Sequence, residues 1–155
     1  MYSDYMNTPI GVIEIQASPR GITQVVFSAS ETHVVHPSEL TNQCKQQLKE
    51  YFSGKRKVFD LPLDQQGTLF QKSIWACLLQ IPFGQTVAYR DIADKVNNRK
   101  AVRAVGAANG KNLIGIIVPC HRVIGGNGTL TGYAGGLDRK AWLLEHERIE
   151  FKNRQ

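Results

Sequence analysis

The chain has 155 residues, 42% of them hydrophobic, which is enough for a core in one or two small domains. No apolar run reaches the roughly 18 residues that a membrane span needs, and none near the N-terminus has the character of an export signal. The three cysteines, Cys44, Cys77 and Cys120, are too few and too dispersed for a disulfide framework and form no CxxC pair. An odd number of thiols suits a reducing compartment, and we expect a cytoplasmic protein.

The formal net charge of +6 is unevenly distributed along the chain. Residues 1–67 carry six Lys and Arg against seven Asp and Glu, a net charge of −1, whereas residues 68–155 carry thirteen against six, a net charge of +7. A concentration of positive charge is expected where a protein meets a polyanion such as a nucleic acid. A basic surface that serves only solubility is the alternative, and charge alone leaves both open.

The N-terminal part predicts a small sheet with one helix. Two β-branched runs, residues 12–16 and 22–27, flank a Ser-Pro-Arg-Gly turn and predict a hairpin, to which a strand starting near Tyr2 can be added. Apolar residues then recur at helical spacing, with Ser38 as the N-cap and Gly54 beyond the end. These are Leu40, Cys44, Leu48, Tyr51 and Phe52. A polar stretch over residues 55–67 marks the domain boundary, so the first domain is predicted at 1–67.

The second part, residues 68–155, predicts a mainly α domain. Thr68-Leu-Phe-Gln71 has the pattern of a capping box, and Phe70, Ile74, Leu78 and Ile81 follow on one helical face. Two shorter helices are expected at about 89–96 and 100–109, separated by Asn-Asn-Arg. A short helix, a tight connection and a second short helix predict a helix-turn-helix.

The second of these short helices carries mostly small residues, with Arg103 standing among them. The small residues are Ala101, Ala104, Gly106, Ala107 and Ala108. A helix that reads the major groove usually carries long polar side chains, whereas a bare helix lets its backbone approach a narrow minor groove or another helix closely. Tight helix packing explains the composition equally well, since a helical glycine costs roughly 1 kcal/mol and needs a compensating contact.

An apolar run, residues 113–118, predicts a buried strand that leads to Cys120. Burial raises the pKa of a thiol and makes it inert, so a reactive Cys120 needs a base. His121 is the nearest base, and Glu147 on a predicted final helix (about 138–147) could orient it. Neighbouring side chains in extended chain point apart, so this pairing needs a turn or a bridging water. A buried structural cysteine is the alternative, and a zinc site is not expected because two further ligands are missing.

The string Val118-Pro-Cys-His-Arg-Val123 resembles the active-site signature of the O6-alkylguanine-DNA alkyltransferases, also called methylated-DNA–protein-cysteine methyltransferases. Five further blocks resemble the family in the family's order. They are Ile81-Pro-Phe-Gly-Gln-Thr-Val-Ala-Tyr89, Ala101-Val-Arg-Ala-Val-Gly106, Asn109-Gly-Lys-Asn112, Gly132-Tyr-Ala-Gly-Gly136 and Trp142-Leu-Leu-Glu-His-Glu147. Together the blocks cover most of residues 70–147, which makes the resemblance specific.

The resemblance implies a function and a fold. The protein would repair O6-alkylguanine, and O4-methylthymine as well, by flipping the base from the minor-groove side of duplex DNA and taking its alkyl group irreversibly onto Cys120. Residues 1–67 would have a ribonuclease H-like α/β fold, and residues 68–155 a winged-helix-like helix-turn-helix. The expected partner is double-stranded DNA, the expected state is a monomer, and no cofactor is expected.

The resemblance also implies a role for each matching residue. Cys120 would be the nucleophile, activated through His121 and Glu147, with Asn112 bracing the turn that holds the site. Tyr89 would press on the target phosphate and bond to the flipped base.

The resemblance also implies residues that contact the DNA and residues that contact the flipped base. Arg103 would fill the vacated place in the base stack, within a DNA-binding helix that includes Ala101, Gly106 and Asn109. Backbone groups at Cys120 and Val123 would meet the guanine edge, and Tyr133 and Ala134 would wall the pocket.

The sequence departs from the family pattern at two places, and two other functions compete with alkyl transfer. Leu113 stands where the family usually has Pro, and His33, His36 and Cys44 do not reproduce the zinc ligands of some relatives, so no metal is predicted. A binding module without chemistry would carry another residue in place of Cys120. A thiol hydrolase would turn over repeatedly, and it would leave the basic helix pair unexplained.

The remaining aromatic, basic and thiol side chains have structural interpretations. Arg122 is expected to be paired structurally. Helical apolar faces place Phe70, Trp75, Cys77 and Trp142 in the core, and Cys44 likewise, so both of these thiols are expected to be inert.

Overall fold

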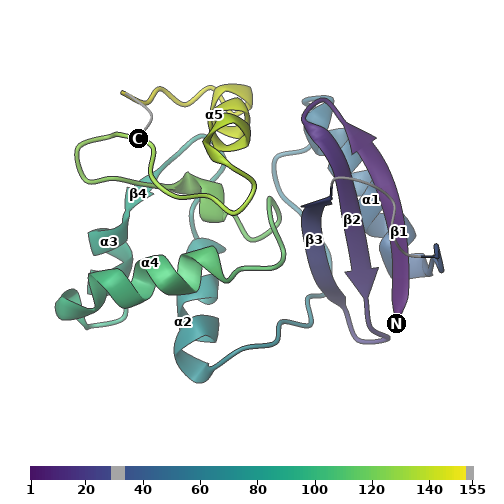
Figure 1. The fold of residues 1–155 in the computed structure, drawn as a ribbon, viewed down its shortest axis with the longest axis horizontal. Helices are drawn as coiled ribbons and strands as arrows, with labels where there is room; N and C mark the ends of the chain where they lie inside the picture. The colour runs from purple at the N-terminus through teal and green to yellow at the C-terminus, as the bar shows by residue number, and fades with distance from the viewer. Residues whose placement is uncertain (29–33, 153–155) are drawn as a thin grey trace. The chain divides into compact units, whose positions relative to one another are not determined.

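The computed structural model describes residues 1–28 and 34–152, and the chain divides into two compact units, residues 1–66 and 67–155 (Figure 1). His33 lies outside the described residues. No helix in the described part of the chain combines the length and the apolar character that a membrane crossing requires.

The first unit is an antiparallel sheet of three strands with one helix packed on it. β1 (Tyr2–Thr8), β2 (Gly11–Ala17) and β3 (Ile22–Ser28) follow one another in the sheet, and α1 (Glu39–Phe52) contacts all three. The predicted hairpin and helix are confirmed. Ser38 caps α1, since its Oγ accepts from the Thr41 backbone N–H at 3.2 Å and the Thr41 hydroxyl accepts in return from the Ser38 N–H at 2.8 Å.

The second unit is mainly helical, as predicted. Its elements are α2 (Leu69–Leu78), β4 (Val87–Ala88), α3 (Tyr89–Lys95), η1 (Arg99–Ala101), α4 (Val102–Gly110), η2 (Cys120–Arg122), β5 (Val123–Ile124) and α5 (Leu137–His146). The two short strands pair in parallel. They hold the start of α3 beside the segment that follows Cys120, so the two halves of the site described below are joined by backbone hydrogen bonds.

α2 begins at the predicted capping box but ends earlier than expected. The Thr68 hydroxyl accepts from the Gln71 N–H at 3.0 Å, and the Gln71 side chain accepts from the Thr68 N–H at the same distance. The helix ends at Leu78, whereas the periodicity extended it to Ile81. After Leu78 the backbone N–H groups of Gln80 and Ile81 donate to the carbonyls three residues before them, so the chain leaves the helix through tight turns before it reaches Pro82. Trp75 then links α2 to α4 by donating its indole N–H to the Ala108 carbonyl at 2.9 Å.

The helix-turn-helix is present as α3 and α4. The chain turns between them at Asn97, whose φ of 56° lies in the left-handed region that asparagine tolerates better than most residues. α4 buries Val105, Ala108 and Asn109, and exposes Arg103 and the small Ala104 and Ala107 on its other side. Helix packing therefore accounts for Ala108 but not for the small residues on the exposed side.

The apolar run over residues 113–118 is not a strand, so that prediction is wrong. The segment is a succession of turns in which Ile116 has a φ of 69° and Leu113 is 52% exposed. Asn112 provides the reason. Its side-chain amide donates to the Val118 carbonyl at 2.9 Å and its side-chain carbonyl accepts from the Ile114 N–H at 3.0 Å, which folds the run back on itself.

Three side chains expected in the core are only half-buried. Cys77, Phe70 and Trp142 keep partial exposure, whereas Trp75 and Cys44 are buried as predicted. Burial raises the pKa of Cys44 to about 12, which keeps that thiol protonated and unreactive.

The α2 cap provides a stability prediction. Thr68→Ala should lower the free energy of unfolding of residues 67–155 by about 1 kcal/mol, because the Gln71 N–H loses its acceptor. Urea unfolding monitored by the fluorescence of Trp75 and Trp142, which both lie in this unit, measures the change. Thr68→Ser keeps the hydroxyl and should stay close to the parent protein; an equal loss in both variants would show that the cap is not the cause.

Candidate active site

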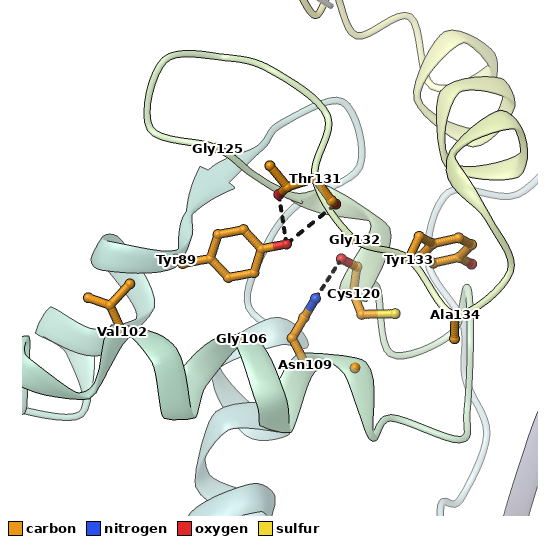
Figure 2. A pocket seen from close by; sticks show the side chains of 11 residues that line it. Tyr89, Val102, Gly106, Asn109, Cys120, Gly125, Thr131, Gly132, Tyr133 and Ala134 are labelled. Atoms are coloured by element: carbon orange, nitrogen blue, oxygen red, sulfur yellow. Dashed lines mark hydrogen bonds between the residues drawn. The ribbon is translucent and has the colours of Figure 1, made fainter. Parts of the chain in front are cut away.

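A cavity of about 480 Å³ opens in the second unit, between α4 and the loop that precedes α5. Figure 2 shows the side chains of eleven residues that line it: Tyr89, Val102, Gly106, Asn109, Gly110, Cys120, Gly125, Thr131, Gly132, Tyr133 and Ala134. Its volume lies in the range of sites that hold a small organic molecule, about 300–1,000 Å³. Six of the residues proposed from the sequence therefore share one cavity: Tyr89, Gly106, Asn109, Cys120, Tyr133 and Ala134.

Cys120 lies in the wall of this cavity and is 5% exposed. It begins the single turn η2, directly after the segment that Asn112 folds. Burial raises the pKa of the Cys120 thiol, while a hydrogen bond from Asn112 and the positive charge of Lys140 act in the opposite direction. The thiol is thus protonated at rest and needs a base in order to react.

His121 and Glu147 supply an acid–base pair behind the cysteine. The His121 Nε2 lies 2.7 Å from a Glu147 carboxylate oxygen, and both side chains are buried. Burial lowers the pKa of His121, against the raising effect of Glu147, so the ring is neutral. Burial alone would raise the pKa of Glu147, but hydrogen bonds and charge from His121 and Arg122 outweigh it and lower the pKa to about 2.

These protonation states fix the tautomer of the ring. An ionised carboxylate only accepts, so Nε2 carries the ring proton and Nδ1 carries the lone pair. Nδ1 is buried and has no hydrogen-bond partner among the residues that the structure describes. His121 therefore presents a free basic nitrogen one residue after the thiol.

Arg122 forms a bidentate ion pair with the Glu147 carboxylate. Its Nε donates to one carboxylate oxygen at 2.7 Å and a terminal nitrogen to the other at 3.1 Å, while the second terminal nitrogen donates to the Ile81 carbonyl at 2.7 Å. This agrees with the structural pairing expected for Arg122 and adds that its partner is the same carboxylate that orients His121.

Tyr89 faces Cys120 across the cavity from the start of α3 (Figure 2). Its hydroxyl accepts from the Thr131 hydroxyl at 3.0 Å and donates weakly to the Thr131 carbonyl at 3.5 Å. Burial raises the pKa of Tyr89, which keeps its O–H available as a donor at neutral pH. The β4–β5 pairing holds this residue in place.

Lys140 was not identified from the sequence. It is fully buried on α5, and its ammonium donates to the backbone carbonyls of Val123 (2.6 Å), Thr131 (2.5 Å) and Gly132 (3.3 Å). Burial lowers its pKa to about 8, against the raising effect of Cys120. Its position among the apolar residues of α5 was the available signal, since a lysine on an apolar helical face is buried with its charge.

The remaining predicted residues lie outside the cavity lining. Asn112, His121 and Glu147 lie behind Cys120, and Val123 is buried in β5. Arg103 is exposed on α4, and Ala101 ends η1 at the start of that helix. Among the described residues, no three His, Cys, Asp or Glu side chains are grouped to hold a metal ion; His36 instead packs its ring against Tyr2.

The fold and the cavity define a helix-turn-helix protein with a buried cysteine in a cavity wall and a His–Glu pair directly after it. Two family models match it: "6-O-methylguanine DNA methyltransferase, ribonuclease-like domain" over residues 1–65 and "6-O-methylguanine DNA methyltransferase, DNA binding domain" over residues 69–149. The chain belongs to the 6-O-methylguanine DNA methyltransferase family.

Individual relatives match over nearly their full length. A methylated-DNA–protein-cysteine methyltransferase of Methanosarcina mazei is 46% identical over 98% of this chain and 100% of its own. A constitutive one of Bacillus subtilis is 45% identical over 99% of both chains. The crystal structure of Mycobacterium tuberculosis OGT in complex with DNA has a TM-score of 0.88 at 43% identity and covers 96% of this chain and 93% of that one.

The Glu147 carboxylate provides a pH prediction. Its pKa is lowered by folding, so its contribution to stability is present above the unfolded pKa near 4.5 and is lost as the pH falls toward 2. Between pH 6 and pH 3 this group should remove about 2 kcal/mol from the free energy of unfolding. Glu147→Gln should be less stable at pH 7, since Arg122 loses its ion pair, and should have a flatter curve.

Urea unfolding at a series of pH values measures both effects. Glu145→Gln, on the exposed side of the same helix, is the matched control and should keep the slope of the parent protein. A slope unchanged in Glu147→Gln would show that folding does not lower the pKa of this carboxylate.

Proposed function

We propose that the protein repairs duplex DNA by moving the alkyl group of O6-alkylguanine irreversibly onto Cys120. The observation that carries the proposal is a buried cysteine in the wall of a base-sized cavity, directly before a His–Glu pair whose free ring nitrogen can take the thiol proton. The names of the relatives support it, and one of them is solved with DNA bound.

The proposed reaction starts with the thiol proton. It passes to Nδ1 of His121, directly or through a bridging water, and Glu147 stabilises the imidazolium that forms. The thiolate then attacks the alkyl carbon; an S–C bond forms, the C–O6 bond breaks and the electron pair goes to the guanine. The guanine takes up one proton, so the thiol proton is balanced overall. Tyr89, with its raised pKa, donates a hydrogen bond to the leaving base.

The proposed route to the cavity is extrusion of the base from the minor-groove side. The exposed side of α4 carries Arg103 beside Ala104 and Ala107, so the backbone can approach a narrow groove while one long cation enters the stack. Ala101 and Gly106 are proposed to lie on the same surface that faces the minor groove. The excess of positive charge in residues 68–155 supports binding to phosphates.

Within the cavity, backbone groups at Cys120 and Val123 are proposed to meet the guanine edge, with Tyr133 and Ala134 as walls. Asn112 braces the turn beneath the cysteine. O4-methylthymine is proposed as a second substrate. The protein is proposed to act as a monomer in the cytoplasm, with residues 1–67 and 68–155 as its two domains.

The product of transfer is a thioether, which has no easy leaving group, so each molecule should act once. Mixed with an excess of duplex DNA carrying O6-methylguanine, the protein should gain one methyl group, located on the Cys120 peptide, and then stop. Intact-mass and peptide mass spectrometry measure this outcome.

Cys120→Ala should gain no methyl group but keep most of its affinity for the duplex, because affinity comes mainly from phosphate contacts. Repeated turnover would indicate a hydrolase instead, and binding without any mass gain would indicate a pure binding module. Label on Cys77 would contradict the assignment of the nucleophile.

Arg103 provides a test of base extrusion. Extrusion costs a few kcal/mol of unstacking and unpairing, and an inserted side chain offsets part of that cost. Arg103→Ala should therefore slow methyl transfer from a duplex by roughly tenfold or more and from a single strand by much less. Single-turnover rates on both DNAs measure the ratio. Arg90→Ala, which removes a basic residue from α3 instead, is the control; equal slowing of both substrates by Arg103→Ala would reduce Arg103 to a phosphate contact.

A further inference from the structure

Thr131 is the cavity residue that contacts the hydroxyl of Tyr89. It lies in the loop before α5 and lines the cavity. Its side-chain hydroxyl donates to the phenol oxygen of Tyr89 at 3.0 Å, as Figure 2 shows. Tyr89 therefore reaches the cavity with its oxygen already engaged as an acceptor.

Both partners of this hydrogen bond are anchored by backbone contacts. Ala88, directly before Tyr89, pairs with Ile124 in the parallel ladder of β4 and β5. The Thr131 carbonyl accepts from the buried ammonium of Lys140 at 2.5 Å. The fold thus sets the position of the two hydroxyls relative to one another, as a pre-organised site requires.

The proton of the Tyr89 hydroxyl is only loosely engaged within the protein. It donates weakly to the Thr131 carbonyl at 3.5 Å, which is long for an O–H···O hydrogen bond. The phenol oxygen, in contrast, accepts from the Thr131 hydroxyl at the shorter distance of 3.0 Å. A hydroxyl that accepts one hydrogen bond becomes a stronger donor of another, because linked hydrogen bonds polarise one another. Tyr89 is left with a strengthened O–H that can turn to a better acceptor in the cavity.

The pKa of Tyr89 agrees with this polarisation. Burial raises the pKa, whereas the hydrogen bond from Thr131 acts in the opposite direction. A donor that stabilises the phenolate also stabilises the partial negative charge that the phenol oxygen gains when its O–H donates strongly. The contact therefore matters most when the acceptor becomes charged, as a guanine does when its C–O6 bond breaks.

We propose that Thr131 is a positioning residue for alkyl transfer: its hydroxyl fixes the Tyr89 oxygen and strengthens the O–H that donates to the leaving base. This rests on the proposed function and deepens it by adding a residue that acts through Tyr89. Because the benefit grows with the charge on the base, it belongs to the transfer step and not to the binding of DNA.

The test measures single-turnover methyl transfer from a duplex carrying O6-methylguanine at a series of protein concentrations. Thr131→Val keeps the shape and removes the hydroxyl; it should lower the limiting rate by about fivefold and leave the half-saturating concentration unchanged. Thr131→Ser keeps the hydroxyl and should retain most of the rate. Thr129→Val, the matched control, removes a hydroxyl of the same loop that bonds to Asn127 and should match the parent protein.

A double-mutant cycle separates positioning from packing. In a Tyr89→Phe background, Thr131→Val should cost nothing further, because the oxygen on which Thr131 acts is already absent. Alkylation of Cys120 by iodoacetamide should be equally fast in the parent protein and in Thr131→Val, since iodide leaves without a hydrogen bond from Tyr89. The melting temperature shows separately that each variant is folded.

The inference is overturned if Thr131→Val transfers methyl as fast as the parent protein, or if Thr131→Ser is as slow as Thr131→Val. It is also overturned if Thr131→Val slows transfer equally in both backgrounds or slows alkylation by iodoacetamide, since Thr131 would then act by packing or on the thiol. If the parent protein itself transfers no methyl group, the proposed function fails, and this inference fails with it.

Discussion

The carboxylate of Glu147 is the group on which the site depends. It accepts the ring proton of His121 and two hydrogen bonds from Arg122, and Arg122 reaches on to the Ile81 carbonyl. One buried anion thus joins the turn that carries the cysteine, the segment after α2 and the end of α5. Because Arg122 already neutralises it, the carboxylate can orient His121 without drawing the proton of the ring onto itself, which leaves the imidazole neutral and basic.

A second constraint is the burial of Cys120. Desolvation raises the pKa of Cys120, which keeps the thiol protonated and slow to react with other electrophiles. The same burial strengthens the electrostatic effect of each nearby charge that favours the thiolate. Lys140 contributes such a charge while its three hydrogen bonds tie β5 to the loop that walls the cavity. The cation that favours ionisation therefore also holds the pocket in shape, so the chemistry and the architecture of this wall cannot be altered independently.

Local signals in the sequence predicted much of this. The caps at Ser38 and Thr68 and the apolar periodicity located the helices, and the string around Cys120 located a cysteine that the structure places in the cavity wall and the histidine behind it. What failed was structure set by hydrogen bonds from side chains to backbone groups. The apolar run after Asn112 has the composition of a strand, and only the side chain of Asn112, bonded across the turn, makes it fold back. The apolar residues of α5 indicated that Lys140 is buried, but its hydrogen-bond partners are backbone carbonyls, which no residue pattern encodes.

In the proposed complex with DNA, the exposed side of α4 has a consequence for how the protein searches for damage. Ala104 and Ala107 are too short to reach the edges of bases, and Arg103 is the long side chain beside them. A surface of this kind has little means of telling one flanking sequence from another. Under the proposed function, discrimination would therefore come from the base in the cavity rather than from the bases that flank it.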